Sequence, residues 1–523
     1  MFWQNNSVVR LALPFVLGMV GANLYIEELL GCQNVLMAVM GGGMVLLLVG
    51  YVWRRQPLMK HLFGLGLTLC VLTVGALLYV MRYERQADVT LAENQEVRGV
   101  VKQQPVEKTK SWAVEIETEE GRLLAYMAKD SIHSPALLDA GDSLSFSCRH
   151  LRLTAPHLLS SDNADSTFLP YRRYLFFKGV SATCYVAADA WERKGRAEAG
   201  LLRVFDDVRR QMHLAYLEAG LEGDGATILE AMTTGNRKGL SAELRQAYAR
   251  SGVAHVLALS GFHLTLVLAI FNMLSHRFCT LRRRRVLAVL FIPLIWSFCL
   301  LAGMPPSLVR ATIMCSIVQL VLVIGRENDM LSGCALAAVV MLAVNPLLLQ
   351  DVGFQLSFVS IVSIFTFRPK LFMGGGERRY IYKFLFDTVC VALVCSLMTF
   401  PLVAYYFGQV PLLGVVTNLA VSLLVPLLMF GALAWWLLYL LGIKWLLLAG
   451  GLAFLAEVMN DVVRVVGSLP FATFTYRPTG VQVAVLYVLL PCVLVFWRTR
   501  KPSMLKASLL SLMALAVCIV AGI

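Results

Sequence analysis

Long uninterrupted apolar runs dominate this sequence and restrict what it can fold into. The first three occupy residues 11–26, 35–53 and 62–81. A run of about 20 apolar residues matches the thickness of the hydrocarbon core of a bilayer. Over the 523 residues the hydrophobic fraction is 58% and the charged fraction is 15%, whereas ordinary soluble domains have about 25% charged residues. The sequence therefore predicts a polytopic α-helical membrane protein.

Basic residues between the apolar runs determine the expected orientation. The loop after the first run contains Glu27 and Glu28, whereas the next loop contains Arg54, Arg55 and Lys60. Because cytoplasmic loops are enriched in Lys and Arg, we expect the N-terminus in the cytoplasm and the end of the third helix outside. The same rule accounts for most of the net charge of +13 without invoking a nucleic-acid partner.

Residues 86–190 interrupt the apolar pattern. The segments VEIET, LLAYMA, LSFSC and VSATCYV alternate with the period of two that is typical of strands, and turn residues separate them. We expect an inserted small β-barrel of about five strands, OB-like and extracytoplasmic. Cys148 and Cys184 would then lie in an oxidising space, where they either form a disulfide or are two unrelated strand cysteines.

A helical segment with one apolar face follows this domain. Its apolar residues are spaced for an amphipathic helix at the membrane surface, and they are Leu201, Phe205, Val208, Met212 and Tyr216. Apolar runs resume near residue 253, and we count about ten more, which gives about 13 transmembrane helices. The expected parts are N-terminal transmembrane helices at 1–85, the barrel at 86–190, the interfacial helix at 191–224, a main transmembrane domain at 225–500 and a C-terminal transmembrane helix at 501–523.

Polar residues within apolar helices are energetically costly in a bilayer, so each is a candidate for function. In residues 254–267, AHVLALSGFHLTLV, four such residues begin an otherwise apolar helix: His255, Ser260, Gly261 and His263. Ser260 and His263 are three residues apart and share a helical face. They could line a wet path or hold two helices together by hydrogen bonds. A third alternative, a Ser/His hydrolase, lacks an evident orienting group and oxyanion site.

Three further clusters lie later in the chain. Arg310 follows two prolines in GMPPSLVRATIM and requires a carboxylate, carbonyls or a phosphate as its partner. Asp351 is a candidate for that partner, and Gln355 lies in the same polar stretch, NPLLLQDVGFQLSF. Asn418 belongs to the stretch 400–426, which prolines and glycines interrupt. Because broken helices at membrane depth are tolerated where they line a cavity, we expect these residues to line or gate a path.

Several catalytic motifs are absent from the sequence. It contains no G-x-x-x-x-G-K-[ST] motif of P-loop ATPases, no H-E-x-x-H motif and no H-x-H-x-D-H run of metallo-β-lactamases. We therefore predict no catalytic residues, no metal site and no cofactor.

The motifs of the main transmembrane domain resemble those of the ComEC competence family. AMTTGNRKGLSAELRQAYARSGVAHVLALSGFHLTLV at residues 231–267 is similar to the family's turn, helix and histidine-containing pattern. PPSLVRATIM, DVGFQLSFVSIVSIF and TNLAVSLLVP match its next signatures in order. The resemblance covers about residues 225–500, and residues 86–190 resemble the family's extracytoplasmic OB domain.

This resemblance implies a channel that passes single-stranded DNA across the cytoplasmic membrane during natural transformation. Many members of the family add a C-terminal metallo-β-lactamase-like nuclease domain, and we expect this chain to lack one. DNA-delivery and nuclease proteins of the uptake machinery, and further copies of the chain, are then the expected partners. The main alternative is a permease for small solutes or lipid-linked molecules.

One segment of the barrel domain combines aromatic and basic residues, which suits stacking on a single DNA strand. Its candidate contacts are Tyr171, Arg172, Arg173, Tyr174 and Lys178. The barrel as a whole contains more Asp and Glu than Lys and Arg, which weakens an electrostatic grip on DNA. The alternative is that these aromatic residues form barrel core and dock a helix.

Overall fold

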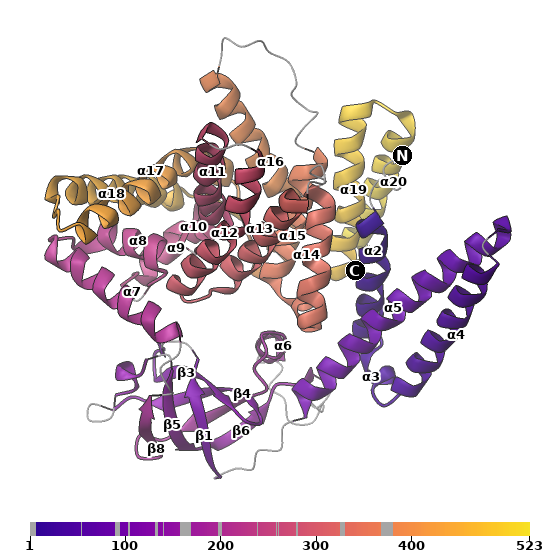
Figure 1. The fold of residues 1–523 in the computed structure, drawn as a ribbon, viewed down its shortest axis with the longest axis horizontal. Helices are drawn as coiled ribbons and strands as arrows, with labels where there is room; N and C mark the ends of the chain where they lie inside the picture. The colour runs from indigo at the N-terminus through magenta and orange to yellow at the C-terminus, as the bar shows by residue number, and fades with distance from the viewer. Residues whose placement is uncertain are drawn as a thin grey trace. The chain divides into compact units, whose positions relative to one another are not determined.

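The structure is a computed structural model that divides into two compact units (Figure 1). The first unit takes residues 1–203 and 335–351, and the second takes residues 204–334 and 352–523. The residues that the structure describes are 7–53, 55–88, 95–102, 105–130, 134–139, 141–156, 169–196, 201–237, 239–257, 259, 261–278, 281–324, 330–367 and 380–522.

The first unit begins with the three expected apolar helices. They are α2 (Ser7–Leu24), α4 (Gln33–Val52) and α5 (Pro57–Ala87), and the short α3 (Ile26–Leu29) precedes α4. Both α2 and α4 pack on α5. The contacts are close because small residues lie in them, as is common between membrane helices: a Cβ atom on Gly75 would lie 2.3 Å from the carbonyl oxygen of Phe15.

Helix α5 is longer than the apolar run that predicts it. It has 31 residues and ends at Ala87, and its last two turns bind the β domain. The ring of Tyr83 lies 4.8 Å from that of Phe176, and Gln86 Nε2 donates a hydrogen bond of 2.9 Å to Ser181 Oγ. The helix therefore continues beyond its apolar residues because its end contacts residues that lie about 95 positions later in the chain.

The β domain is a mostly antiparallel sheet whose strands follow the order β6-β7-β4-β3-β1-β5-β8, with β2 paired to β3. The strands are β1 (Glu96–Val101), β2 (Val106–Glu107), β3 (Ser111–Thr118), β4 (Gly121–Ala128), β5 (Asp142–Ser147), β6 (Arg149–Leu153), β7 (Ala182–Val186) and β8 (Trp191–Arg196). The four predicted strand segments coincide with β3, β4, β5 and β7. Residues 191–196 correct the prediction: they were expected in the interfacial helix, but they pair with β5.

The two faces of this sheet are buried in different ways. Alternate residues such as Val114, Ile116 and Leu123 form the domain core. The other face carries Ala113 and Leu124, which pack against the helix α6 (Leu169–Phe177) and the residues after it. The described part of the unit also contains the 3-10 helices η1 (Pro135–Leu137) and η3 (Pro346–Gln350), and η3 packs against α2, α5 and α6.

The second unit consists of helices and a small two-stranded sheet. The amphipathic helix is present as α7 (Leu201–Glu218). The following helices are α8 (Gly223–Thr234), α9 (Ala242–Arg250), α10 (Ala254–Leu257), α11 (Gly261–Phe278), α12 (Leu281–Leu301), α13 (Pro306–Ile324), α14 (Met330–Val344), α15 (Val352–Phe367), α16 (Tyr380–Phe407), α17 (Gly414–Leu440), α18 (Leu446–Ser468), α19 (Gly480–Thr499) and α20 (Pro502–Ala521). The division between the units passes through α14.

Strands β9 (Gln409–Pro411) and β10 (Thr473–Thr475) pair antiparallel, so the chain enters α17 and leaves α18 at the same place. The hydrophobic core of this part joins α7, α8, α9 and α10 to α17 and α18. A second cluster joins α11, α12 and α13. The unit is therefore built of at least two packed layers of helices.

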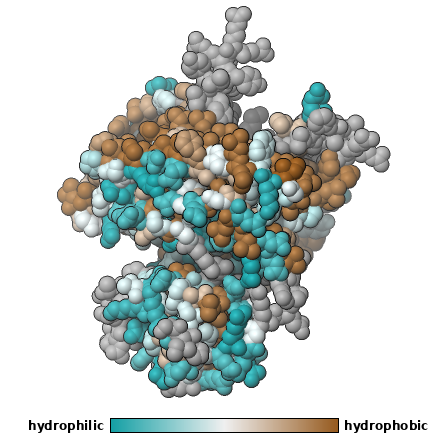
Figure 2. Space-filling view, turned by 90° about the vertical axis from the view of Figure 1, so that its left-hand side faces the viewer, coloured by the Kyte–Doolittle hydropathy of each residue, from teal (hydrophilic) through white to brown (hydrophobic). Residues whose placement is uncertain are grey.

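Seven helices in the described part of the chain are long and apolar enough to cross a membrane. They are α4, α5, Phe386–Phe407 of α16, α17, α18, Gly480–Trp497 of α19, and α20. Shorter apolar helices lie within α2, α12, α13, α14 and α15. Figure 2 shows hydrophobic side chains over a broad part of the surface, as on a protein that faces lipid. The chain is a helical membrane protein; the count of about 13 crossings remains a prediction.

Candidate functional site

The predicted path residues belong to both units. Asp351 belongs to the first unit, whereas His255, Gly261, His263, Arg310, Gln355 and Asn418 belong to the second. Ser260 lies outside the described residues. The expected pairing of Arg310 with Asp351 would join the two units, and it stays a prediction.

Two of the predicted residues lie on neighbouring helices, α11 and α13. His263 is fully buried on α11, and Arg310 is 7% exposed near the start of α13. The helices approach closely because Gly261 has no side chain: a Cβ atom there would lie 3.2 Å from the Cβ of Ala311. Ser307 Oγ also donates a hydrogen bond of 2.9 Å to the carbonyl oxygen of Leu259. His255, by contrast, is exposed on the short α10.

Helix α13 carries further buried polar side chains that sequence reasoning missed. Thr312 and Gln319 are fully buried and Ser316 is 9% exposed. Ser316 Oγ accepts a hydrogen bond of 3.2 Å from Trp296 Nε1. The amide group of Gln319 has no hydrogen-bond partner among the described residues. The spacing 312, 316, 319 places the three side chains on one helical face, and this spacing is the signal that could have identified them.

The Gly-Asn-Arg turn of the 231–267 motif is held by a largely buried carboxylate at the end of α8. Glu230 Oε1 accepts a hydrogen bond of 2.8 Å from Asn236 Nδ2 and lies 2.9 Å from His213 Nδ1 of α7. Gly235 ends the helix in the left-handed conformation, with φ of 77°. Thr234 Oγ1 also donates to the Glu230 carbonyl oxygen at 2.9 Å. The motif therefore fixes α7 and the connection to α9.

The remaining predicted residues, Gln355 and Asn418, lie on α15 and α17. The side-chain oxygen of Gln355 on α15 accepts a hydrogen bond of 3.0 Å from the hydroxyl of Tyr406 on α16. Asn418 is half-buried in the second turn of α17. Helix α16 contains Pro401 and α17 contains Pro426, which remove backbone hydrogen bonds from both helices. Of the predicted breaks, Pro401 and Pro426 thus lie inside continuous helices, whereas Gly408 and Pro411 lie where the chain leaves α16 and before α17 begins.

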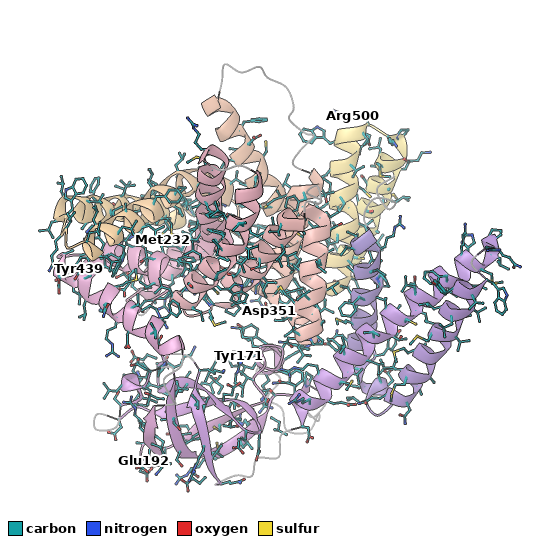
Figure 3. The ribbon with its side chains drawn as sticks, in the orientation of Figure 1. Tyr171, Glu192, Met232, Asp351, Tyr439 and Arg500 are labelled. Carbon is teal, nitrogen blue, oxygen red and sulfur yellow. The ribbon has the colours of Figure 1, made fainter. Side chains whose placement is uncertain are left out.

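The aromatic and basic segment of the first unit has two sides. Leu175, Phe176 and Phe177 of α6 are buried, whereas Tyr171 and Tyr174 are 41% and 42% exposed. The two exposed rings are stacked, with their centroids 6.3 Å apart. The interpretation as core and docking surface is correct for one side of α6, whereas the other side is accessible and its contact with DNA stays a prediction (Figure 3).

Lys178 contacts Tyr174 on this accessible side of α6, and it interacts electrostatically with Asp351. The ammonium group of Lys178 lies 4.9 Å from the centre of the Tyr174 ring. Burial lowers the pKa of Lys178, but a hydrogen bond to Tyr174 and the carboxylates of Glu115 and Asp351 outweigh it, so the pKa lies above its ordinary value. Tyr171 and Asp351 are labelled in Figure 3, on α6 and at the end of η3. Sequence reasoning did not associate Asp351 with this segment.

The two cysteines of the β domain are adjacent in space. Cys148 and Cys184 are both buried, and their sulfur atoms lie 3.2 Å apart. They are brought together by the pairing of β6 with β7, in which Arg149 faces Tyr185. Among the described residues, no group of three or more His, Cys, Asp or Glu side chains is arranged to hold a metal ion.

Buried polar groups on packed apolar helices define a class: a polytopic helical membrane protein with polar side chains inside its helical domain. A family model described as Competence protein matches residues 232–501, which is just over half of the chain. The chain belongs to this competence protein family, the family of ComEC.

Two curated relatives agree with this assignment. ComE operon protein 3 of Bacillus subtilis (strain 168) is 29% identical over 218 residues, which cover 42% of this chain and 26% of the relative. Competence protein ComA of Neisseria gonorrhoeae is 27% identical over 269 residues, which cover 49% of this chain and 37% of the relative. The chain thus spans about a quarter to two fifths of the length of these relatives. No solved structure matches it.

Proposed function

We propose that this protein forms the path by which one strand of DNA crosses the cytoplasmic membrane during natural transformation. The observation that carries the proposal is the set of buried polar side chains on α11 and α13, which includes His263, Arg310 and Gln319. These side chains lie inside the region that matches the competence family. Polar groups are costly at membrane depth and are retained mainly where they serve transport or pairing.

The chemistry of these side chains suits a phosphate-bearing strand. Arg310 supplies a guanidinium that can donate two parallel hydrogen bonds to a phosphate group. The amide of Gln319 and the imidazole of His263 can donate and accept hydrogen bonds. A permeating strand exchanges its hydration for these groups, and its passage is driven by another component of the uptake machinery, because the sequence has no ATPase motif.

The proposal includes an orientation and a set of partners. The N-terminus is cytoplasmic and the β domain, closed as an OB-like barrel, lies outside, where the Tyr171 and Tyr174 side of α6 meets the incoming strand. DNA-delivery and nuclease proteins act before and after this step, and further copies of the chain complete the path.

The deciding experiment measures transformation frequency with labelled linear DNA. It compares the wild type, a clean deletion, Arg310→Ala, Gln319→Leu and a matched control, Leu320→Ala, on the exposed side of the same helix. We expect the deletion to reduce transformation to background while DNA still binds outside the membrane. Arg310→Ala and Gln319→Leu should reduce it by at least tenfold at equal protein abundance, and Leu320→Ala should not. Normal transformation by the deletion strain would instead favour the permease alternative.

A further inference from the structure

Helices α17 and α18 are each long and apolar enough to cross the membrane. The charged side chains on α18 and their ion pairs argue against such a crossing. Its middle and second half carry Glu457, Asn460, Asp461 and Arg464. Arg464 binds all three nearby carboxylates: Glu457 Oε1 at 2.8 Å, Asp461 Oδ1 at 3.0 Å, and Asp224 of α8. A helix that crosses a bilayer would place this network in or near the hydrocarbon core.

The polar side of α18 lies against α8 and α9 along most of its length. A Cβ atom on Gly225 would lie 2.7 Å from the Ala453 carbonyl oxygen, and one on Gly467 would lie 2.9 Å from that of Ala247. From Ala453 to Gly467 the helix rises about 21 Å at 1.5 Å per residue. Between these contacts the hydroxyl of Tyr248 donates a hydrogen bond of 2.9 Å to Asn460.

The helices that pack with α18 expose charged side chains, which are stable only in contact with water. Helix α9 exposes Glu243 and Arg245, and α7 exposes Asp207 and Arg210. Charged side chains at the centre of a lipid bilayer are rare because they lose their hydration. Helix α7 also begins only five residues after β8, so this layer starts on the barrel's side of the membrane.

The end of α17 and the loop that joins it to α18 form hydrogen bonds with the same layer of helices. Glu218, at the end of α7, accepts hydrogen bonds from Lys444 Nζ at 2.8 Å and from the Tyr439 hydroxyl at 3.2 Å. The hydrogen bond from Lys444 lowers the pKa of Glu218. The ring of Tyr216 stacks on Trp435 at 5.2 Å. Tyr439 is labelled in Figure 3 near this end of the hairpin.

The opposite side of the hairpin is apolar and uncovered by the described residues. Leu427, Leu437, Leu447 and Phe454 are 60%, 64%, 80% and 70% exposed. An apolar hollow of about 340 Å³ lies on this hairpin, and its lining includes Trp445, Leu448 and Leu455. Figure 2, which faces the hairpin end, shows hydrophobic side chains above and hydrophilic ones below them. Trp, Tyr and Lys at the tip are the residues that prefer a membrane–water interface.

We propose that the α17–α18 hairpin lies along the membrane surface on the barrel's side, with its apolar face among the acyl chains of that leaflet, and does not cross the bilayer. In Figure 1 the two helices run across the direction of α19 and α20. Strands β9 and β10 hold the two ends of the hairpin together, so both ends lie on the same side of the membrane. The rest of the chain therefore has the same orientation whether the hairpin crosses the bilayer twice or not at all. Loop charges cannot distinguish these two arrangements. The proposal rests on the topology of the proposed function and reduces the expected crossings from about 13 to about 11.

The test is the side from which the hairpin tip can be labelled. The Lys444→Cys variant is treated with a membrane-impermeant maleimide in spheroplasts, before and after lysis, and modification is read at position 444 by peptide mass spectrometry. Two reference variants report the two sides: Leu137→Cys, in the barrel domain, and Lys501→Cys, between α19 and α20. We expect the thiol at position 444 to be labelled under the same conditions as the thiol at position 137.

Labelling of position 444 only under the conditions that label position 501 would overturn the proposal. If the thiol at position 444 reacts from neither side, Asp461→Cys decides. The side chain of Asp461 is 65% exposed, so a thiol there labels from the barrel's side if α18 is interfacial and is unreactive within a spanning helix. If the Leu137→Cys variant itself labels only after lysis, the proposed orientation of the whole protein fails. The comparison of position 444 with position 137 still decides the hairpin.

Discussion

At Gly235 both the backbone conformation and a close neighbour leave no room for a side chain. It has a φ of 77°, and an added Cβ would lie 2.6 Å from the Ala302 carbonyl oxygen. Gly223 offers a matched control, because it has a φ of 84° but no atom within 4 Å of an added Cβ. The left-handed conformation costs an L-residue about 1–2 kcal/mol.

We therefore expect Gly223→Ala to lower the free energy of unfolding by about 1 kcal/mol and Gly235→Ala to lower it clearly more. The measurement is thermal unfolding of the purified protein in detergent. Equal losses for the two variants would show that the contact with Ala302 does not constrain the turn.

At Cys148 and Cys184 the structure predicts a disulfide in the mature protein. The sulfur atoms lie 3.2 Å apart in a buried site, and a bridge between residues 36 apart would stabilise the fold by about 2–4 kcal/mol. Alkylation under denaturing conditions, followed by mass spectrometry, should modify both only after reduction. Cys299 and Cys315, buried in the helical domain, serve as controls and should react without reductant. Modification of Cys148 and Cys184 without reductant would contradict the prediction.

Sequence reasoning succeeded at residues whose role is local. The alternation that buries Val114 and Ile116 was visible in the sequence, and so was the polar start of α11. It failed where contacts between distant segments decide. Asp351 associates with Lys178 of α6, which no local pattern shows, and Gln319 is one polar residue in an apolar helix whose partners are other helices.

At the scale of elements, α6 separates a docking side from an accessible side. The exposed, stacked rings of Tyr171 and Tyr174 resemble the stacking platforms of proteins that bind single strands, where each base contributes about 1–3 kcal/mol. Tyr171→Ala should weaken binding of a labelled oligothymidine to the full-length protein about tenfold, or about 1.4 kcal/mol. The readout is fluorescence anisotropy at two salt concentrations.

Tyr185→Ala is the matched control for this experiment. Tyr185 is also a tyrosine of the barrel domain and is 40% exposed, but it lies on β7. Its replacement should leave binding unchanged. A similar loss with both variants would show that the α6 side is not a specific contact for DNA.

Boundaries of elements were harder to predict than their presence. The apolar run 62–81 predicts a helix, but α5 continues to Ala87 because Tyr83 and Gln86 contact the β domain. The expected interfacial helix at 191–224 rests on apolar spacing that begins at Leu201, and residues 191–196 instead pair with β5 as a strand. Long-range contacts decided both ends.

At the scale of the whole molecule, the end of α5 contacts the β domain directly, through Tyr83 and Gln86. Insertion of alanines between Met81 and Arg82 tests this link, since each residue turns the helix by about 100°. Two alanines would rotate the barrel by about 200°, and four would return it to within about 40° of its place. Transformation frequency at equal protein abundance should fall strongly with two alanines and less with four. Equal effects of the two insertions would indicate that transformation does not depend on the orientation of the β domain about the axis of α5.

The length of α5 has one more consequence. Its 31 residues span about 46 Å, whereas the hydrocarbon core is about 30 Å thick. The whole bilayer, including its headgroup regions, is about 40–45 Å thick. If α5 runs along the membrane normal, its last turn therefore lies at the level of the headgroups, and so does the part of the β domain that Tyr83 and Gln86 contact.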